Sequence, residues 1–209
     1  ETILEMLNNL QEAALPHALK ENAEIISYAK KNGIDGEIEP WDIPYWSERM
    51  REDKFNLKEE ELKPYFSLDN VLRELFAIAN RLFGIYIQER LEKVEKWHTD
   101  VRYYDVYEGD DSNNEIIAGF YLDPYVRPET KRSGAWMNSC VDKNRALGHN
   151  VPVAYLVCNG SPPSKDKPSL LSFSDVETLF HEFGHGLQHM LTKIDIGDIS
   201  GINLSLIHI

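Results

Sequence analysis

The segment SDVETLFHEFGHGLQHML, residues 174–191, holds the most informative pattern in the chain. Ser174 and Glu177 have the S-x-x-E spacing of a capping box, in which two side chains accept hydrogen bonds from the first unpaired amides of a helix. The apolar residues that follow recur at helical spacing. Together these features predict an amphipathic helix that begins at Asp175.

The helix is expected to separate an apolar side from a side that carries chemistry. At about 100° per residue, one side gathers Val176, Leu179, Phe180, Phe183, Leu187, Met190 and Leu191. His181 and His185 fall almost opposite, one turn apart, where two imidazoles can share one metal ion. Glu182 flanks the same face and is placed to take a proton from a zinc-bound water, whose pKa zinc lowers to about 7. The pattern predicts that His181 and His185 bind one Zn²⁺ and that Glu182 is the general base.

A plainer explanation is that these three side chains are ordinary solvated polar residues. H-E-x-x-H on a helix is a specific pattern for a zinc peptidase, so we favour the metal site. Gly184 and Gly186 each cost helix stability relative to alanine, which indicates that something approaches the backbone closely. Packing against a neighbouring helix explains these two glycines equally well.

His189 is excluded as a third ligand, because it lies two turns beyond His181, about 12 Å along the helix axis. A metzincin site would need Gly and His where this chain has Gln188 and Leu191. The third ligand is therefore expected from a later element and is usually a carboxylate.

The first third of the chain has a mostly helical pattern. Residues 2–31 have helical spacing, but Pro16 lacks a backbone donor and is expected to split them into two helices, with Gly33 as the stop. Residues 40–46 are expected to form a loop rich in proline and tryptophan, and the charged segment 48–61 a short helix that faces solvent.

The middle of the chain changes from helix to strand. Residues 68–83 have an amphipathic helical pattern that Gly84 ends. Residues 101–107 and 116–122 are rich in β-branched and aromatic residues around a turn, which predicts a β-hairpin. Two more strands are expected at residues 134–141 and 151–158, giving four in all.

Composition narrows the class of protein. With 209 residues, 42% of them hydrophobic, the chain is long enough to bury a core. A net charge of −13 without a basic stripe disfavours nucleic acid and anionic membranes as partners. No apolar run approaches the roughly 20 residues of a membrane span. Cys140 and Cys158 are expected to be buried thiols of a reducing compartment.

Several segments resemble the thimet oligopeptidase and oligopeptidase A family, the M3 metallopeptidases. The most specific is FHEFGHGLQHMLT at Phe180–Thr192. The others follow in the family's order: PWDIPYWSERMRE at 40–52, LFGI at 82–85, FYLDPY at 120–125, GAWM at 134–137 and PVAYLVCN at 152–159.

The resemblance implies a zinc endopeptidase that cuts short peptides at internal bonds, inside a channel between mostly helical halves. We expect an α+β, predominantly helical, zincin-like fold with a small sheet beside the H-E-x-x-H helix. Residues 1–66 would form a helical scaffold segment and residues 67–209 a partial catalytic domain. The strands at 134–141 and 151–158 are expected to offer an edge to an extended peptide, although simple sheet packing also accounts for them.

The chain departs from the family near its end. Family members take the third zinc ligand from a glutamate on a following helix, but no Glu follows Glu182 here. The resemblance stops at Asn203, so we expect a fragment truncated at its C-terminal end that lacks the downstream transition-state stabilisers and is inactive alone. Asp195, Asp198 or His208 could substitute as a ligand, but each is expected to be an ordinary residue.

Two other functions compete with the peptidase. A non-catalytic peptide-binding module on the same scaffold has no need of Glu182, which disfavours it. A zinc hydrolase of non-peptide amides is compatible with the helix but not with the wider resemblance. We expect a monomer in the cytoplasm; the chain starts at Glu1 without an initiator Met, so a targeting segment upstream and an organellar location are the alternative.

Overall fold

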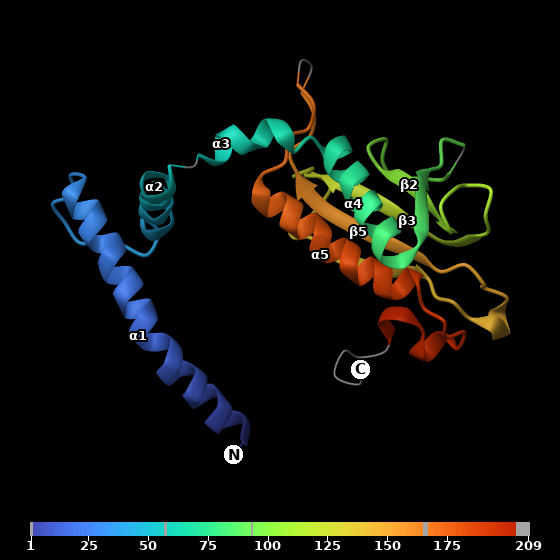
Figure 1. Ribbon diagram of the computed structural model, residues 1–209, viewed down its shortest axis with the longest axis horizontal. Helices are drawn as coiled ribbons and strands as arrows, with labels where there is room; N and C mark the ends of the chain where they lie inside the picture. Colours follow the sequence, from blue (N-terminus) through green and yellow to red (C-terminus); the bar gives the residue numbers. More distant parts are fainter. Residues whose placement is uncertain (1, 57, 93, 165–166, 204–209) are drawn as a thin grey trace. The chain divides into compact units, whose positions relative to one another are not determined.

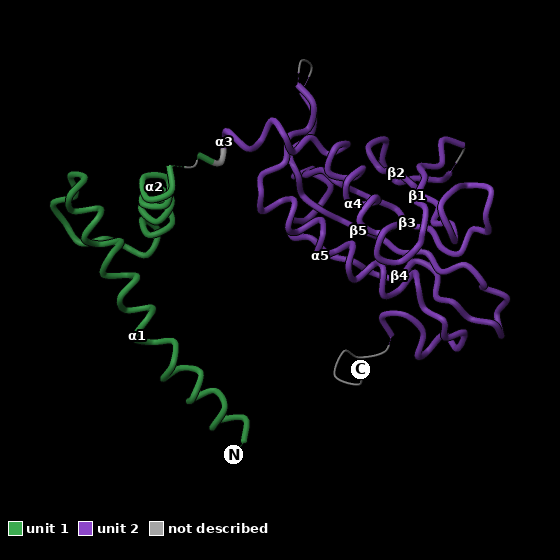
Figure 2. The backbone as a smooth tube through the Cα atoms, in the orientation of Figure 1, with its two compact units in different colours: residues 1–58 green, residues 59–209 purple. Residues whose placement is uncertain are grey.

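The computed structural model describes residues 2–56, 58–92, 94–164 and 167–203 and has an α+β fold (Figure 1). The chain forms two compact units, residues 1–58 and 59–209 (Figure 2). Helical residues outnumber strand residues, as expected. None of the described helices combines the length and the apolar character that a membrane span needs. The predicted division into domains after residue 66 stays a prediction.

The first unit holds two helices, α1 (Thr2–Lys31) and α2 (Ile43–Phe55). The expected break at Pro16 is wrong, because α1 runs through it. Proline loses one helical hydrogen bond, but its φ suits a helix, and the residues around it are exposed, so water can satisfy the freed carbonyl. Gly33, at φ +100°, ends the helix as predicted. The loop before α2 is shorter than expected, because α2 begins at Ile43.

An aromatic cluster joins α1 to α2. The Tyr28 ring lies 6.3 Å from Trp46, in an edge arrangement. Its hydroxyl donates hydrogen bonds to the Asp53 carboxylate and the Arg49 carbonyl. Trp46, which also contacts the Tyr45 ring at 5.1 Å, thus packs within this unit, whereas Trp41 is 75% exposed.

The second unit is built on a five-stranded sheet with the order β1-β2-β3-β5-β4. Its strands are β1 (Ile85–Glu89), β2 (Arg102–Glu108), β3 (Ile116–Tyr125), β4 (Trp136–Val141) and β5 (Val153–Gly160). β3 and β5 are parallel, and the other neighbours are antiparallel. The hairpin β2–β3 and the strands β4 and β5 confirm the predictions. The count of four strands is wrong, because the short β1 was not recognised.

Helices α4 (Leu68–Phe83) and α5 (Phe173–Met190) lie over the same face of this sheet (Figure 1). α4 matches its predicted bounds, and Gly84 ends it in the left-handed conformation. Side chains from α4, α5 and alternate positions of the strands form one core. The short elements α3 (Glu59–Leu62) and four single-turn 3₁₀ helices, at 63–65, 145–147, 197–199 and 201–203, complete the unit.

The opposite face of the sheet carries a buried ion cluster around Asp123. Arg127 binds the Asp123 carboxylate with two hydrogen bonds of 2.8 and 2.6 Å. Lys131 adds a bond of 3.1 Å and also donates to the carbonyls of Tyr125 and Cys158. Burial alone would raise the pKa of Asp123, but the hydrogen bonds from Arg127, Trp97 and Lys131 outweigh it and the pKa is lowered. The cluster ties the loop after β3 to both central strands.

Replacing Lys131 with methionine should test whether the ion cluster around Asp123 holds the loop after β3 to the sheet. The Lys131 side chain is 8% exposed, so its loss leaves the Asp123 carboxylate and three carbonyl groups, those of Asp123, Tyr125 and Cys158, short of a buried donor. We expect the free energy of unfolding in urea to fall by about 3 kcal/mol. The exposed Lys193→Met change is the control and should have little effect. Equal unfolding midpoints for the two variants would show that the cluster does not hold the loop.

Candidate metal centre

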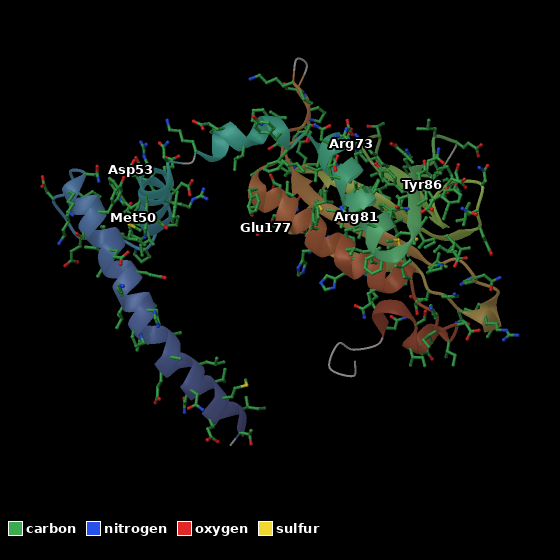
Figure 3. The ribbon with its side chains drawn as sticks, in the orientation of Figure 1. Met50, Asp53, Arg73, Arg81, Tyr86 and Glu177 are labelled. Carbon is green, nitrogen blue, oxygen red and sulfur yellow. The ribbon has the colours of Figure 1, made fainter. Side chains whose placement is uncertain are left out.

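Helix α5 begins two residues earlier than the sequence predicted. The Ser172 hydroxyl accepts a hydrogen bond of 3.1 Å from the Asp175 amide, and the Asp175 carboxylate accepts one of 2.9 Å from the Ser172 amide. This is a capping box with aspartate in place of glutamate. The box predicted at Ser174 and Glu177 is therefore wrong, and both residues lie exposed within the helix, where Figure 3 labels Glu177.

The buried side of α5 packs on the two central strands. Phe183 is 2% exposed, and its ring lies 5.9 Å from Phe120 of β3 and 6.1 Å from Phe76 of α4. A Cβ added at Gly186 would lie 3.0 Å from the Leu156 side chain of β5. The close approach predicted at Gly186 is therefore confirmed, and its neighbour is a strand.

Two predictions for this helix are wrong. Phe180 was assigned to the packed side but is 37% exposed, because it sits at the margin of the apolar stripe. A Cβ added at Gly184 would meet no described atom within 4 Å, so close packing does not explain that glycine.

His181 and His185 lie on the side of α5 away from the core, as predicted, and they converge. Their Nε2 atoms are 3.1 Å apart, and the ring planes are nearly perpendicular at 84°. Two ligands at about 2.0–2.1 Å from a tetrahedral zinc ion lie roughly 3.3 Å apart, so this pair fits a shared zinc. Without metal, the same distance permits a hydrogen bond between two neutral rings.

Glu182 lies closer to the sheet than the prediction placed it. It is 7% exposed, on the buried side that also carries Gly186 and His189. Along the helix it is turned by about 60° from His185, so it borders the histidine side without sharing it. Burial raises the pKa of the Cys158 thiol to about 12, and the negative charge of Glu182 adds to that rise, which places the carboxylate near β5.

The Glu182 carboxylate has hydrogen-bond acceptor positions that no described residue uses. Among the described residues, no group donates a hydrogen bond to it. Its two oxygens are not fully buried, because neither is among the completely buried polar atoms without a partner in the described residues. A solvent-reachable carboxylate with unused acceptor sites beside two convergent imidazoles can hold and move a proton.

The described residues do not supply a third ligand. Within residues 2–56, 58–92, 94–164 and 167–203, no three His, Cys, Asp or Glu side chains gather as a metal site would require. The Asp195 carboxylate lies 4.0 Å from the Arg145 guanidinium rather than in a metal site, and the Asp198 side chain is exposed. His208 lies outside the described residues.

His189 has a structural position. It is fully buried, and its Nε2 lies 3.1 Å from the Val141 carbonyl at the end of β4. It therefore ties the end of α5 to the edge strand, which agrees with its exclusion as a zinc ligand. Of the two strands expected to offer an edge to a peptide, β4 lies at an edge of the sheet, whereas β5 is paired on both sides; the expectation for β5 is wrong. Neither sulfur of Cys140 and Cys158 is in a disulfide, and Cys158 is buried whereas Cys140 is only half-buried.

The chain is similar in sequence to known peptidases. The family model described as Peptidase family M3 matches residues 1–208. The chain is 46% identical over 209 residues to the organellar oligopeptidase A, chloroplastic/mitochondrial, of Arabidopsis thaliana, covering 97% of this chain and 26% of that protein. It is 45% identical over 205 residues to the probable cytosolic oligopeptidase A of the same plant, covering 95% and 29%.

A relative named for a different activity also matches. The dipeptidyl carboxypeptidase of Escherichia coli (strain K12) is 38% identical over 204 residues, covering 97% of this chain and 29% of that protein. The chain thus spans little more than a quarter of the length of these relatives. The family model matches as far as residue 208, past Asn203. The relatives, in contrast, leave a few per cent of the chain unmatched. The expectation that the resemblance stops at Asn203 therefore stays a prediction.

Zinc titration followed by calorimetry should detect the paired imidazoles. We expect one zinc ion per chain, and replacing His185 with asparagine should weaken binding by more than about tenfold, since even the loss of an outer partner of a zinc ligand costs that much. The control is His17→Asn, which removes an exposed imidazole from α1. Equal zinc affinity in the two variants would contradict the pairing.

Proposed function

The chain belongs to peptidase family M3, and from this we propose that it carries part of the zinc-dependent centre of an endopeptidase that hydrolyses internal bonds of short peptides. The observation that carries the proposal is the 3.1 Å approach of the His181 and His185 Nε2 atoms beside the unpaired Glu182 carboxylate. The activity belongs to a longer protein, because the chain spans 26% and 29% of the oligopeptidase relatives.

In this proposal His181 and His185 hold the metal and Glu182 handles the proton. Bound zinc supplies a Lewis acid for the peptide carbonyl and lowers the pKa of a water molecule. Glu182 accepts the proton of the attacking water and later passes it to the leaving amine. The packing of Phe183 and Gly186 on the sheet keeps both imidazoles in one place while this happens.

The substrate backbone is proposed to pair with β4. This strand forms an edge of the sheet, and α5 contacts both β4 and β5. An extended peptide can add to such an edge through backbone hydrogen bonds, which suits substrates of varied sequence. The helix beside a sheet edge is the arrangement that we expect of a zincin.

The remaining parts of the centre are proposed to come from outside residues 1–209. They are a glutamate as third zinc ligand and the groups that stabilise the transition state. Residues 67–209 then form part of the catalytic domain and residues 1–66 part of a helical scaffold, and the 209-residue chain alone turns over no peptide. The names of the relatives favour the cytoplasm or an organelle, and we propose a monomer.

Changing Glu182 to glutamine in the longer protein tests the general base. On a short quenched-fluorescence peptide, we expect turnover to fall by about 10²–10⁴-fold while zinc content stays the same. Glu177→Gln, an exposed change on the same helix (Figure 3), should leave turnover unaltered. Equal turnover by Glu182→Gln and its control would reject the proposed base, whereas no turnover by the unaltered longer protein would favour a non-catalytic peptide-binding module.

The same assay distinguishes internal cleavage from removal of C-terminal dipeptides. A peptide with an amidated C-terminus should still be cut at an internal bond, because the proposed enzyme pairs with the backbone and needs no terminal carboxylate. Cleavage only of peptides with a free C-terminus, with release of dipeptides, would assign the activity named for the Escherichia coli relative.

A further inference from the structure

A cavity of about 440 Å³ lies on the face of the sheet opposite α5. Along β3 and β5, Phe120 and Leu156 point into the core beneath the helices, whereas their neighbours Asp123, Tyr155 and Val157 line the cavity on the other side. The cavity is therefore separated from the metal centre by the thickness of the sheet. Its size lies within the usual range for small-ligand sites.

The floor of this cavity is rigid and its charges are already paired. It consists of the cluster described above, in which Asp123 accepts hydrogen bonds from Arg127, Lys131 and Trp97. The Asp123 side chain is 3% exposed and that of Lys131 is 8% exposed. Lys131 also donates to three backbone carbonyls, so its protons are in use. A ligand finds a fixed floor here and no free partner on Asp123 or Lys131.

The walls are aromatic and half exposed. Trp97 packs against Tyr155 with a ring separation of 5.5 Å, yet 51% of Trp97 remains exposed. Its indole N–H is used on Asp123 at 3.0 Å, so the open part of the ring offers only apolar surface. Trp136, at the start of β4, is 48% exposed and lines the same cavity. Indole surfaces left open around a cavity suit a flat apolar group.

One cation at the cavity, Arg132, has no partner among the residues that the structure describes. Three cationic side chains and one carboxylate line it, in a chain of net charge −13. Arg127 and Lys131 are paired with Asp123, but Arg132 has no ion pair or hydrogen bond with any residue that the structure describes. A single free guanidinium matches a ligand with a single negative charge, and its planar fork matches a carboxylate.

We propose that this cavity binds a carboxylate attached to an aromatic group, with the ring between Trp97 and Trp136 and the carboxylate on Arg132. A free aromatic acid and the last residue of a peptide share this chemistry. The site is independent of the metal centre, so a negative result for this cavity would not contradict the proposed peptidase function.

The four tryptophans of the chain allow a direct test. With fluorotryptophan incorporated, each indole gives a fluorine NMR signal, and Trp41 and Trp46 in the first unit serve as internal references. N-acetylphenylalanine should shift the Trp97 and Trp136 signals saturably, with a Kd on the order of 1 mM for so small a ligand. N-acetylphenylalanine amide and N-acetylglycine, which lack the charge and the ring respectively, should bind markedly more weakly.

Variants assign the charged contact. Arg132→Gln should weaken binding of N-acetylphenylalanine by about three- to tenfold. Arg81→Gln, an exposed arginine on α4 (Figure 3), is the matched control and should not change it. Both positions are exposed, and unchanged unfolding midpoints will show that each variant is folded.

A tetrapeptide that ends in phenylalanine distinguishes the two sources of the ligand. Tighter binding than the free acid supports the site with a peptide C-terminus as its ligand, and equal binding supports it with a small acid. The proposal is overturned if the acid and its amide bind equally, if Arg132→Gln and Arg81→Gln behave alike, or if the Trp97 and Trp136 signals do not move.

Discussion

The contact of α5 with the central strands is the constraint on which the rest of the second unit depends. Phe183 fits between rings of α4 and β3, and the missing side chain at Gly186 lets the helix approach Leu156 of β5. A helix turns by about 100° per residue, so this contact decides which side chains face away from the sheet. His181 and His185 are among those side chains, and their spacing of one helical turn lets their rings converge.

Both ends of α5 are also fixed. The capping box of Ser172 and Asp175 satisfies its first amides, and His189 holds its last turn to the carbonyl of Val141. Gly201 closes over His189 at φ +58°, where a Cβ would lie 2.5 Å from the imidazole Nδ1. The segment after the helix is thereby seated against its end. A helix held at its two ends and along one side presents its imidazoles with little freedom, which metal binding requires.

Sequence patterns predicted those parts of the fold that local physics controls. The helix at 68–83, the hairpin and the strands β4 and β5 follow from periodicity, and Gly33 and Gly84 end helices where a positive φ is needed. The break predicted at Pro16 does not occur, because an exposed helix tolerates one lost hydrogen bond. The start of α5 differs from the prediction because two overlapping S-x-x-acid patterns compete, and the earlier one, Ser172 with Asp175, forms the capping box.

The site was predictable to a similar degree. Helical spacing predicts that His181 and His185 face away from the core. It does not predict that Glu182 is buried, because that burial depends on how closely β5 packs against the helix. The role of His189 depends on Val141, 48 residues away, and the aromatic cavity joins Trp97 to Trp136 across the sheet. Contacts between residues so far apart in the sequence cannot be predicted from local sequence patterns.

Anomalous diffraction at the zinc absorption edge, from crystals grown with zinc, tests the central claim most directly. The account predicts one strong peak at about 2.0–2.1 Å from the Nε2 atoms of both His181 and His185. A peak bound elsewhere, or imidazoles joined only by their own hydrogen bond in the presence of zinc, would contradict it.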